Sequence, residues 1–157
     1  MKTELIIEKR LAEIGVALPD VPKPVASYVP AVSSGNLLFL SGQLCTVDGE
    51  LKYRGKVGKE VALEDACEAA KAAAINSLAV IKQQIGSLDK VRRIVKVVGY
   101  VASEPGFSEQ AKVVNGTSDF LVEVFGKKGS HARSAVGVAS LPLNVPVEVE
   151  MIVEIEE

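Results

Sequence analysis

The sequence is poor in the residues on which metal, redox and nucleotide sites usually depend. Among 157 residues there are two cysteines, one histidine and no tryptophan. Cys45 and Cys67 lack CxxC spacing, so neither a zinc site nor a disulfide framework is expected. No GxGxxG motif occurs, and residues 55–59 lack the spacing of a phosphate loop. We therefore expect no metal and no cofactor, and the lone His131 is interpreted as a surface residue or as the rim of a pocket.

Neither sign of charge dominates the chain. Lys and Arg total 18 against 20 Asp and Glu, which gives a net charge of -2. This balance provides no basic field for nucleic acid or anionic lipid, and the cluster from Lys90 to Lys96 is interpreted as a solvated strand edge. Charged residues also interrupt the apolar runs of the N-terminus, unlike a secretory or membrane segment. We expect a cytoplasmic protein with a small-molecule partner and no contact with membrane or nucleic acid.

The length predicts one packed domain preceded by a short addition. Ile7, Leu11 and Ile14 share one face of a predicted N-terminal helix that ends at Gly15. A proline-containing linker, Pro19–Pro24, follows this helix. We divide the chain into an N-terminal helix and linker (residues 1–23) and a main domain (residues 24–157).

The hydrophobic pattern of the main domain predicts two helices among short strands. Turn residues join the first two strands, and also the last two, into hairpins. Asn115-Gly116 interrupts good helix formers in the second helix and is interpreted as an irregularity. The predicted strands are residues 26–32, 37–41, 94–102, 132–139 and 145–155, and the predicted helices are residues 63–85 and 107–125.

The last predicted hairpin brings two charged residues together. Alternation places Val136 and Val138 on the core face of the first arm, which sends Arg133 to the polar face. In the second arm the valines face the core and Glu148 is polar. If Val136 pairs with Val145, Arg133 lies opposite Glu148. This pair is either an exposed ion pair or a carboxylate-binding arginine beside a glutamate that handles a proton.

The same region carries a family resemblance. The segment HARSAVGVASLPLNVPVEVEMIVEIE (residues 131–156) is similar to the signature of the RidA/YjgF family, with its Arg-Ser start, Leu-Pro turn and acidic-hydrophobic-acidic end. Upstream, Tyr28, the stretch Leu40–Gln43 and Asn115 fall where the family has similar residues. The resemblance spans about residues 24–156, so the N-terminal helix indicates a subgroup with an extension.

The resemblance implies an α+β fold similar to that of chorismate mutase, a single β-β-α-β-α-β-β domain with both helices on one face of the sheet. It also implies a homotrimer with a barrel-like centre and sites between neighbouring subunits. The uncovered face of such a sheet needs a cover, which an oligomer supplies.

The function that the resemblance implies is hydrolytic deamination. Family members convert 2-aminoacrylate and related 2-imino or 2-enamino acids to 2-keto acids and ammonia without a cofactor. By similarity, Arg133 holds the substrate carboxylate and Glu148 positions the attacking water. Tyr28 closes one wall of the pocket, Ser41 and Gly42 line it, and Asn115 braces it.

Three departures and three alternatives accompany this interpretation. Ala135 stands where many members carry cysteine, so a reactive thiol is not expected there. The N-terminal helix and the charged loop 46–60 leave the substrate's size open. The first alternative is a non-catalytic trimer that binds a small carboxylate. A ribonuclease or translation inhibitor would need a basic track that is lacking, and chorismate mutase activity would rest on fold analogy alone.

Overall fold

The computed structural model describes residues 5–21, 23–24 and 26–157. Residues 1–4 of the predicted N-terminal segment and Pro22 of the predicted linker lie outside the described residues. Short 3-10 turns connect several of the elements. The helices and strands are α1 (Ile6–Glu13), β1 (Ala31–Ser34), β2 (Leu37–Leu40), β3 (Gln43–Leu44), α2 (Leu63–Ile85), β4 (Val91–Ala102), α3 (Gln110–Phe125), β5 (Ala132–Val138) and β6 (Val147–Ile155).

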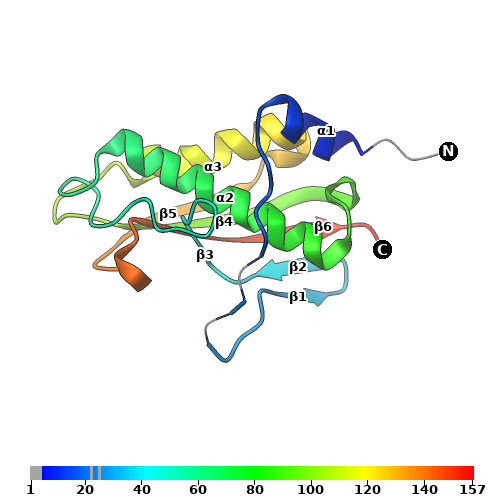
Figure 1. Ribbon diagram of the computed structural model, residues 1–157, viewed down its shortest axis with the longest axis horizontal. Coiled ribbons are helices and arrows are strands. Elements are labelled where there is room, and N and C mark those ends of the chain that lie inside the picture. Colours follow the sequence, from blue (N-terminus) through cyan, green and yellow to red (C-terminus); the bar gives the residue numbers. More distant parts are fainter. Residues whose placement is uncertain (1–4, 22, 25) are drawn as a thin grey trace.

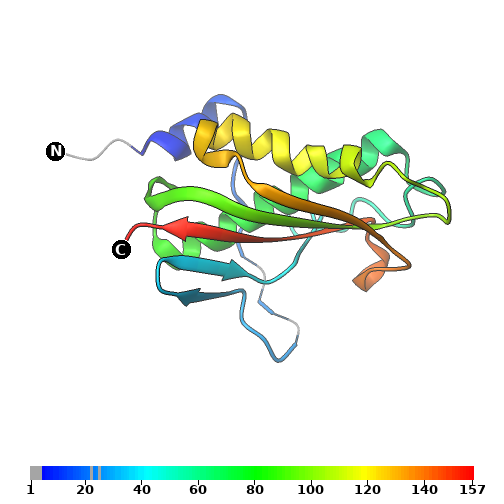
Figure 2. The same cartoon turned by 180° about the vertical axis from the view of Figure 1, so that it is seen from behind.

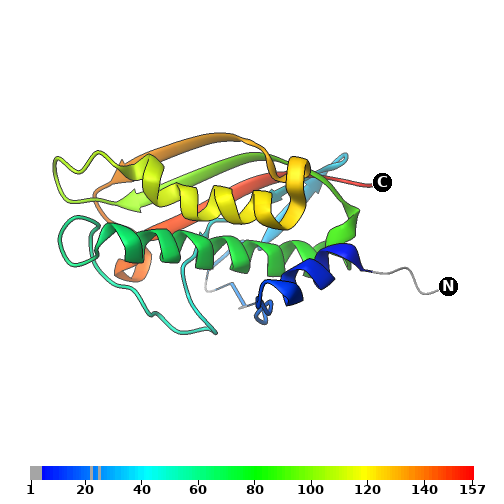
Figure 3. The ribbon, with the colours of Figure 1, turned by 90° about the horizontal axis from the view of Figure 1, so that it is seen from above.

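One mixed six-stranded sheet forms the base of the molecule. Its strands lie in the order β1-β2-β6-β4-β5, and the short β3 pairs with β6. β5 is parallel to β4, whereas the other pairs are antiparallel. Figures 1 and 2 show α2 and α3 on the same side of this sheet, and Figure 3 shows them lying over it. The expected chorismate-mutase-like α+β order is therefore confirmed, with β3 and α1 as additions.

Small residues bring the two long helices close to each other and to the sheet. A Cβ atom at Gly116 of α3 would lie 2.0 Å from the carbonyl oxygen of Cys67, and one at Gly99 of β4 would lie 2.4 Å from a methyl of Val114. The Thr117 hydroxyl donates to the Ala70 carbonyl at 2.6 Å. The inward face of α2 is rich in fully buried alanines, among them Ala66, Ala69, Ala70 and Ala73. This packing fixes the position of α3 over the sheet.

The predicted pairing is wrong at the C-terminal end of the main domain and correct at its first hairpin. The predicted hairpin of residues 132–139 with 145–155 is wrong, because β4 lies between β5 and β6. The turn-like residues 140–144 are compatible with a hairpin. In the structure they connect β5 to β6 past the end of β4, and β5 pairs with the outer edge of β4. The first hairpin is confirmed, although its first strand begins only at Ala31 and its turn is Gly35-Asn36.

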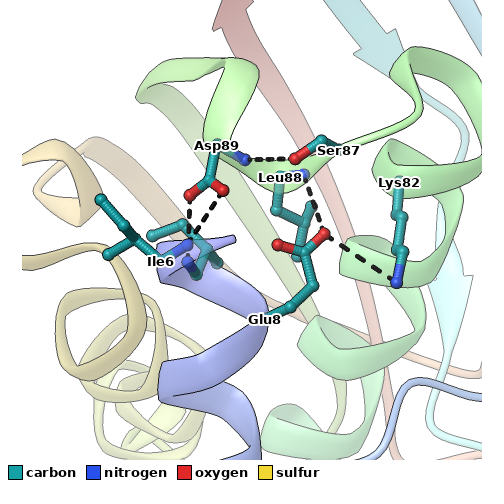
Figure 4. Close-up of polar contacts among 7 residues, drawn as sticks. Ile6, Glu8, Lys82, Ser87, Leu88 and Asp89 are labelled. Carbon is teal, nitrogen blue, oxygen red and sulfur yellow. Dashed lines mark hydrogen bonds and ion pairs between the residues drawn. The ribbon is translucent and has the colours of Figure 1, made fainter. Parts of the chain in front are cut away.

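The N-terminal helix α1 is attached by reciprocal capping with the connection between α2 and β4 (Figure 4). The Asp89 carboxylate accepts hydrogen bonds from the backbone N–H groups of Ile6 and Ile7, each at 3.0 Å. In return, Glu8 accepts the N–H of Leu88 at 3.4 Å. As expected, the buried face of α1 includes Ile7 and Leu11. Because these first N–H groups have no partner within the helix, a distant carboxylate takes the place of an N-cap residue.

We predict that Asp89→Ala loosens α1 specifically. Loss of both acceptors should destabilise this helix by about 0.5–2 kcal/mol, the usual effect of removing a cap. Hydrogen exchange followed by mass spectrometry should show faster exchange in residues 6–13 and little change in α2 or α3. The exposed Asp20→Ala is the matched control. Unchanged exchange in α1 would show that the helix does not depend on this cap.

Candidate functional site

Arg133 is held against α3 by neutral acceptors. Its Nη1 group donates to Asn115 Oδ1 at 2.8 Å and to Ser118 Oγ at 3.1 Å, and its Nη2 group donates to the Ala111 carbonyl at 3.3 Å. Within the described part of the chain, no carboxylate lies at ion-pair distance from this guanidinium. The half-buried cation therefore keeps its charge unpaired, and its remaining N–H groups, on Nε and Nη2, are those that fit a planar carboxylate.

Asn115-Gly116, which the sequence pattern indicated as an irregularity, has two structural roles instead. The helix continues through both residues from Gln110 to Phe125. Gly116 is the point of close approach to α2, and Asn115 presents its side-chain oxygen to Arg133. Asn115 thus contacts Arg133, while its expected role in bracing a substrate pocket stays a prediction.

Ser118 and His131 extend the contacts of Arg133 and were not found from the sequence as partners. The Ser118 hydroxyl lies 2.9 Å from His131 Nε2, and His131 Nδ1 lies 2.6 Å from the Gly129 carbonyl. A carbonyl only accepts, so in the neutral ring Nδ1 carries the hydrogen and Nε2 accepts from Ser118. Ser118 then accepts from Arg133, which limits how the guanidinium can turn. The one available signal was that Ser118 follows Asn115 by three positions, on the same helix face.

Glu148 lies on the other face of the sheet. Its side chain fills the space above Gly42, where a Cβ atom would lie 2.0 Å from Glu148 Oε1. Partial burial, followed by the charge of Glu150, raises the pKa of the Glu148 carboxyl. Beside it, the Tyr100 hydroxyl donates to Glu150 at 2.9 Å, and burial and this bond raise the pKa of Tyr100. Glu148 is thus a carboxyl group of increased basicity.

The structure does not bring Arg133 and Glu148 together within one chain. Arg133 pairs with Val97, which is fully buried under the helices, whereas Glu148 pairs with Tyr100 on the uncovered face. The predicted cross-strand contact is therefore wrong, and so is the assignment of Val136 to the core face, since Val136 is 40 % exposed. The prediction that side chains alternate along β5 is correct, but it assigned each set to the wrong face of the sheet. Apolar residues on both faces of this sheet make the two assignments look alike in the sequence.

The other expected site residues lie near Glu148 rather than near Arg133. Tyr28 and Gly42 line a cavity of about 290 Å³ beside β3. The Ser41 hydroxyl donates to the Val29 carbonyl at 2.6 Å, so it secures the segment before β1. The expected residues thus do not form one site within the chain: Arg133 and Asn115 lie together on the helix side of the sheet, Gly42 lies against Glu148, and Tyr28 shares the cavity beside β3 with Gly42.

The thiols and the carboxylates provide no alternative chemistry among the described residues. Burial raises the pKa of Cys45 and of Cys67, which disfavours the reactive thiolate, and Ala135 has no thiol. No group of three or more His, Cys, Asp or Glu side chains in residues 5–21, 23–24 and 26–157 is arranged to hold a metal ion. In the same residues, no helix has the length and apolar character needed to cross a bilayer.

Comparison with known proteins identifies a family with this architecture. Residues 8–155 match the family described as YjgF/chorismate mutase-like, putative endoribonuclease. The crystal structure of the protein Atu1372 from Agrobacterium tumefaciens has 46% sequence identity and a TM-score of 0.90, covering 97% of this chain and 93% of that one. Protein TCP17 from Trypanosoma cruzi is 39% identical over 95% of this chain and 94% of its own length. A 2-iminobutanoate/2-iminopropanoate deaminase from Dermatophagoides farinae is 32% identical over 90% and 95%, respectively.

The fold and the match together define a chorismate-mutase-like α+β protein. The chain belongs to the YjgF/RidA family. The match begins within α1, so an N-terminally extended subgroup and the division of the chain at residue 24 stay predictions.

The raised pKa of Glu148 predicts a pH-dependent stability difference. A raised carboxyl pKa means that folding favours the protonated form. The stability that this raised pKa gives to the folded protein is fully present below the pKa of Glu148 in the unfolded chain, about 4.3. It is lost as the pH rises through the pKa of Glu148 in the folded protein. Glu148→Gln should therefore raise the thermal midpoint at about pH 7 and have little effect near pH 4. The control is Glu123→Gln on the exposed side of α3, and an equal shift of Glu148→Gln at both pH values would contradict the assignment.

Proposed function

We propose that this protein hydrolyses 2-imino and 2-enamino acids to 2-keto acids and ammonia, at sites that combine residues of two copies of the chain. The observation that carries the proposal is the division of the expected site into two halves. An unpaired arginine is held open on one side of the sheet, and a carboxyl group of raised pKa lies on the other. The 2-iminobutanoate/2-iminopropanoate deaminase among the relatives supports the same reaction.

Arg133 supplies the carboxylate-binding half. All 2-imino acids carry a carboxylate next to the imine carbon, and a guanidinium binds a carboxylate through two parallel hydrogen bonds. The contacts with Asn115 and Ser118 fix the plane of Arg133 before the substrate arrives. Such preorganisation places the imine carbon in a defined position and lowers the entropic cost of the reaction.

Glu148 acts as the general base of the site. A protonated imine is already electrophilic, so the enzyme needs only to aim a water molecule at its carbon. Glu148 accepts a proton as the water oxygen bonds to that carbon, and the proton then passes to the nitrogen. As the resulting carbinolamine collapses, its hydroxyl proton passes to Glu148 and the C–N bond breaks, which releases ammonia and the 2-keto acid. Its raised pKa makes Glu148 a stronger base than an exposed carboxylate, which suits this role.

A second copy is required because one chain keeps the two halves apart. The face of the sheet that the helices leave uncovered carries exposed apolar side chains, among them Val32 at 56 %, Phe39 at 41 % and Val136 at 40 %. Such a patch on a sheet is typical of a subunit interface. Covering it with a neighbouring chain, in a homotrimer with a barrel-like centre, brings the Glu148 face of one copy towards the helix edge of the next.

The remaining expected residues surround this reaction. Gly42 leaves the space that the Glu148 side chain fills, Tyr28 forms a wall, and Ser41 secures the segment that carries Tyr28. Asn115 braces Arg133. No cofactor is needed, because the electrophile is part of the substrate.

A carboxylate-binding trimer without catalysis is the second candidate, because the open guanidinium alone accounts for binding. Turnover separates the two functions. The endoribonuclease activity in the family description has less support here. The net charge is -2, and Arg93 of the one basic cluster is paired with Glu154 at 3.0 Å.

Substitution of the two charged residues should separate binding from turnover. Arg133→Ala should abolish turnover and binding of the keto-acid product, because the fork that holds the carboxylate is lost. Glu148→Gln should preserve binding and reduce kcat by about 10²–10⁴-fold, the usual contribution of a general base. The assay generates 2-aminoacrylate with a serine dehydratase, adds semicarbazide as a trap, and measures how far the protein suppresses the semicarbazone.

Matched controls are Arg92→Ala and Glu123→Gln, both at exposed positions. Arg133→Lys tests geometry, since it keeps the positive charge but loses the planar fork. Wild-type turnover in both Arg133→Ala and Glu148→Gln would refute the proposed site. Binding of keto acid without any turnover by the unmodified protein would support the non-catalytic trimer.

Mixing the two inactive variants tests whether the site spans two copies. Arg133→Ala subunits still provide Glu148, and Glu148→Gln subunits still provide Arg133. In a ring of random composition, about a quarter of the interfaces combine both intact residues. Co-refolded mixtures should therefore regain about a quarter of the wild-type activity per site, whereas separately refolded samples should stay inactive. No recovery in mixtures whose subunits are shown by native mass spectrometry to have exchanged would place both residues in one chain.

A further inference from the structure

Glu148 and Glu150 of β6 form a pair of like charges on the uncovered face of the sheet. Both are half-buried, whereas Val149 between them is fully buried in the core. Side chains two positions apart on a strand project from the same face, about 6.5 Å apart. Two carboxylates at this separation disfavour each other's ionisation. Partial burial raises the pKa of Glu148, and the charge of Glu150 raises it further.

Tyr100 of β4 fixes the position of the Glu150 carboxylate. In the register of β4 and β6, Tyr100 lies opposite Glu148, and Val98 lies opposite Glu150. The Tyr100 hydroxyl nevertheless donates to Glu150 Oε1 at 2.9 Å, diagonally across the strands. Burial, this bond and the charges of both glutamates raise the pKa of Tyr100, because its hydroxyl lies near both carboxylates. The hydroxyl hydrogen is therefore used by Glu150 and is not available to Glu148.

The Glu148 carboxylate accepts no hydrogen bond from any residue that the structure describes. A donor would stabilise its charged form and make it a weaker base. The other ionisable groups of this face have partners elsewhere. Lys96 of β4 donates to Ser134 at 3.4 Å, and Glu154 of β6 is paired with Arg93 at 3.0 Å. β2, β3 and β5 add no ionisable side chain to the uncovered face.

We propose that Glu150, anchored by Tyr100, is a positioning residue of the deaminase that keeps Glu148 basic enough to take the proton of the attacking water. This inference rests on the proposed function and adds two residues to the same site. The requirement is greatest in the proposed assembly, where Arg133 of a neighbouring copy favours the charged, less basic form of Glu148. The negative charge of Glu150 opposes this effect.

The test is the pH dependence of imine hydrolysis in Glu150→Gln, which keeps the size of the side chain and removes its charge. The acidic limb of kcat/KM reports the protonation of the base in the free enzyme. Without the like charge the pKa of Glu148 falls, so this limb should move to lower pH. The weaker base should lower kcat on the plateau about two- to ten-fold and change KM by less than about two-fold.

Tyr100→Phe is the second variant, since it keeps the ring and removes the donor. The freed Glu150 carboxylate can then turn away from Glu148, so the acidic limb should move in the same direction by a smaller amount. The matched control is Glu154→Gln, which removes one charge from the same strand at a site paired with Arg93. Its acidic limb should stay at the pH of the unmodified protein.

Carboxyl carbon NMR of protein labelled in glutamate follows the same titration without turnover. The Glu148 signal, assigned by its loss in Glu148→Gln, should titrate at lower pH in Glu150→Gln than in the unmodified protein. If it titrates at the same pH in both, or if Glu154→Gln moves the acidic limb equally far, the role of Glu150 is refuted while the deaminase function stands. If the unmodified protein hydrolyses no imine, the proposed function itself fails, and with it the catalytic use of Glu150.

Discussion

The close contact of α3 with α2 and β4 is the constraint on which the rest of the molecule depends. It is possible because glycines stand at the two points of contact, Gly116 against the Cys67 carbonyl and Gly99 against Val114. A methyl group at either point would push α3 away from its neighbours. The Arg133 side chain reaches three acceptors on α3 only because the helix lies this close to the sheet. The backbone packing of the core therefore sets the geometry of the candidate site.

For the proposed reaction, the arrangement accounts for how few reactive side chains would be needed. The candidate site contains no available thiolate, and no cluster of metal ligands occurs among residues 5–21, 23–24 and 26–157. What the protein provides is position and charge. An arginine is oriented by neutral acceptors, and a carboxyl group becomes more basic through partial burial. The proposed function asks for no more than this, because its substrate brings an electrophilic carbon. The two contributions lie on opposite faces of one sheet.

Much of the local structure could be predicted from residue patterns. The helix from Leu63 to Ile85 was predicted with the bounds that the structure shows, because apolar periodicity and a glycine at its end are local signals. The pairing of β5 was not predictable in this way. Its neighbour in space, β4, is separated from it by the whole of α3, and the short connector before β6 is equally compatible with a hairpin.

By itself, the sequence determined the order of the helices and of all strands except the short β3, the family and the candidate residues, since these depend on local pattern and motif. The tertiary structure alone decided that Arg133 and Glu148 lie on opposite faces, and that Ser118 and His131 complete the contacts of the arginine. Alternation along a strand shows which side chains share a face. It does not show which face meets the helices when both faces carry apolar residues, because that choice depends on strand neighbours far away in the chain.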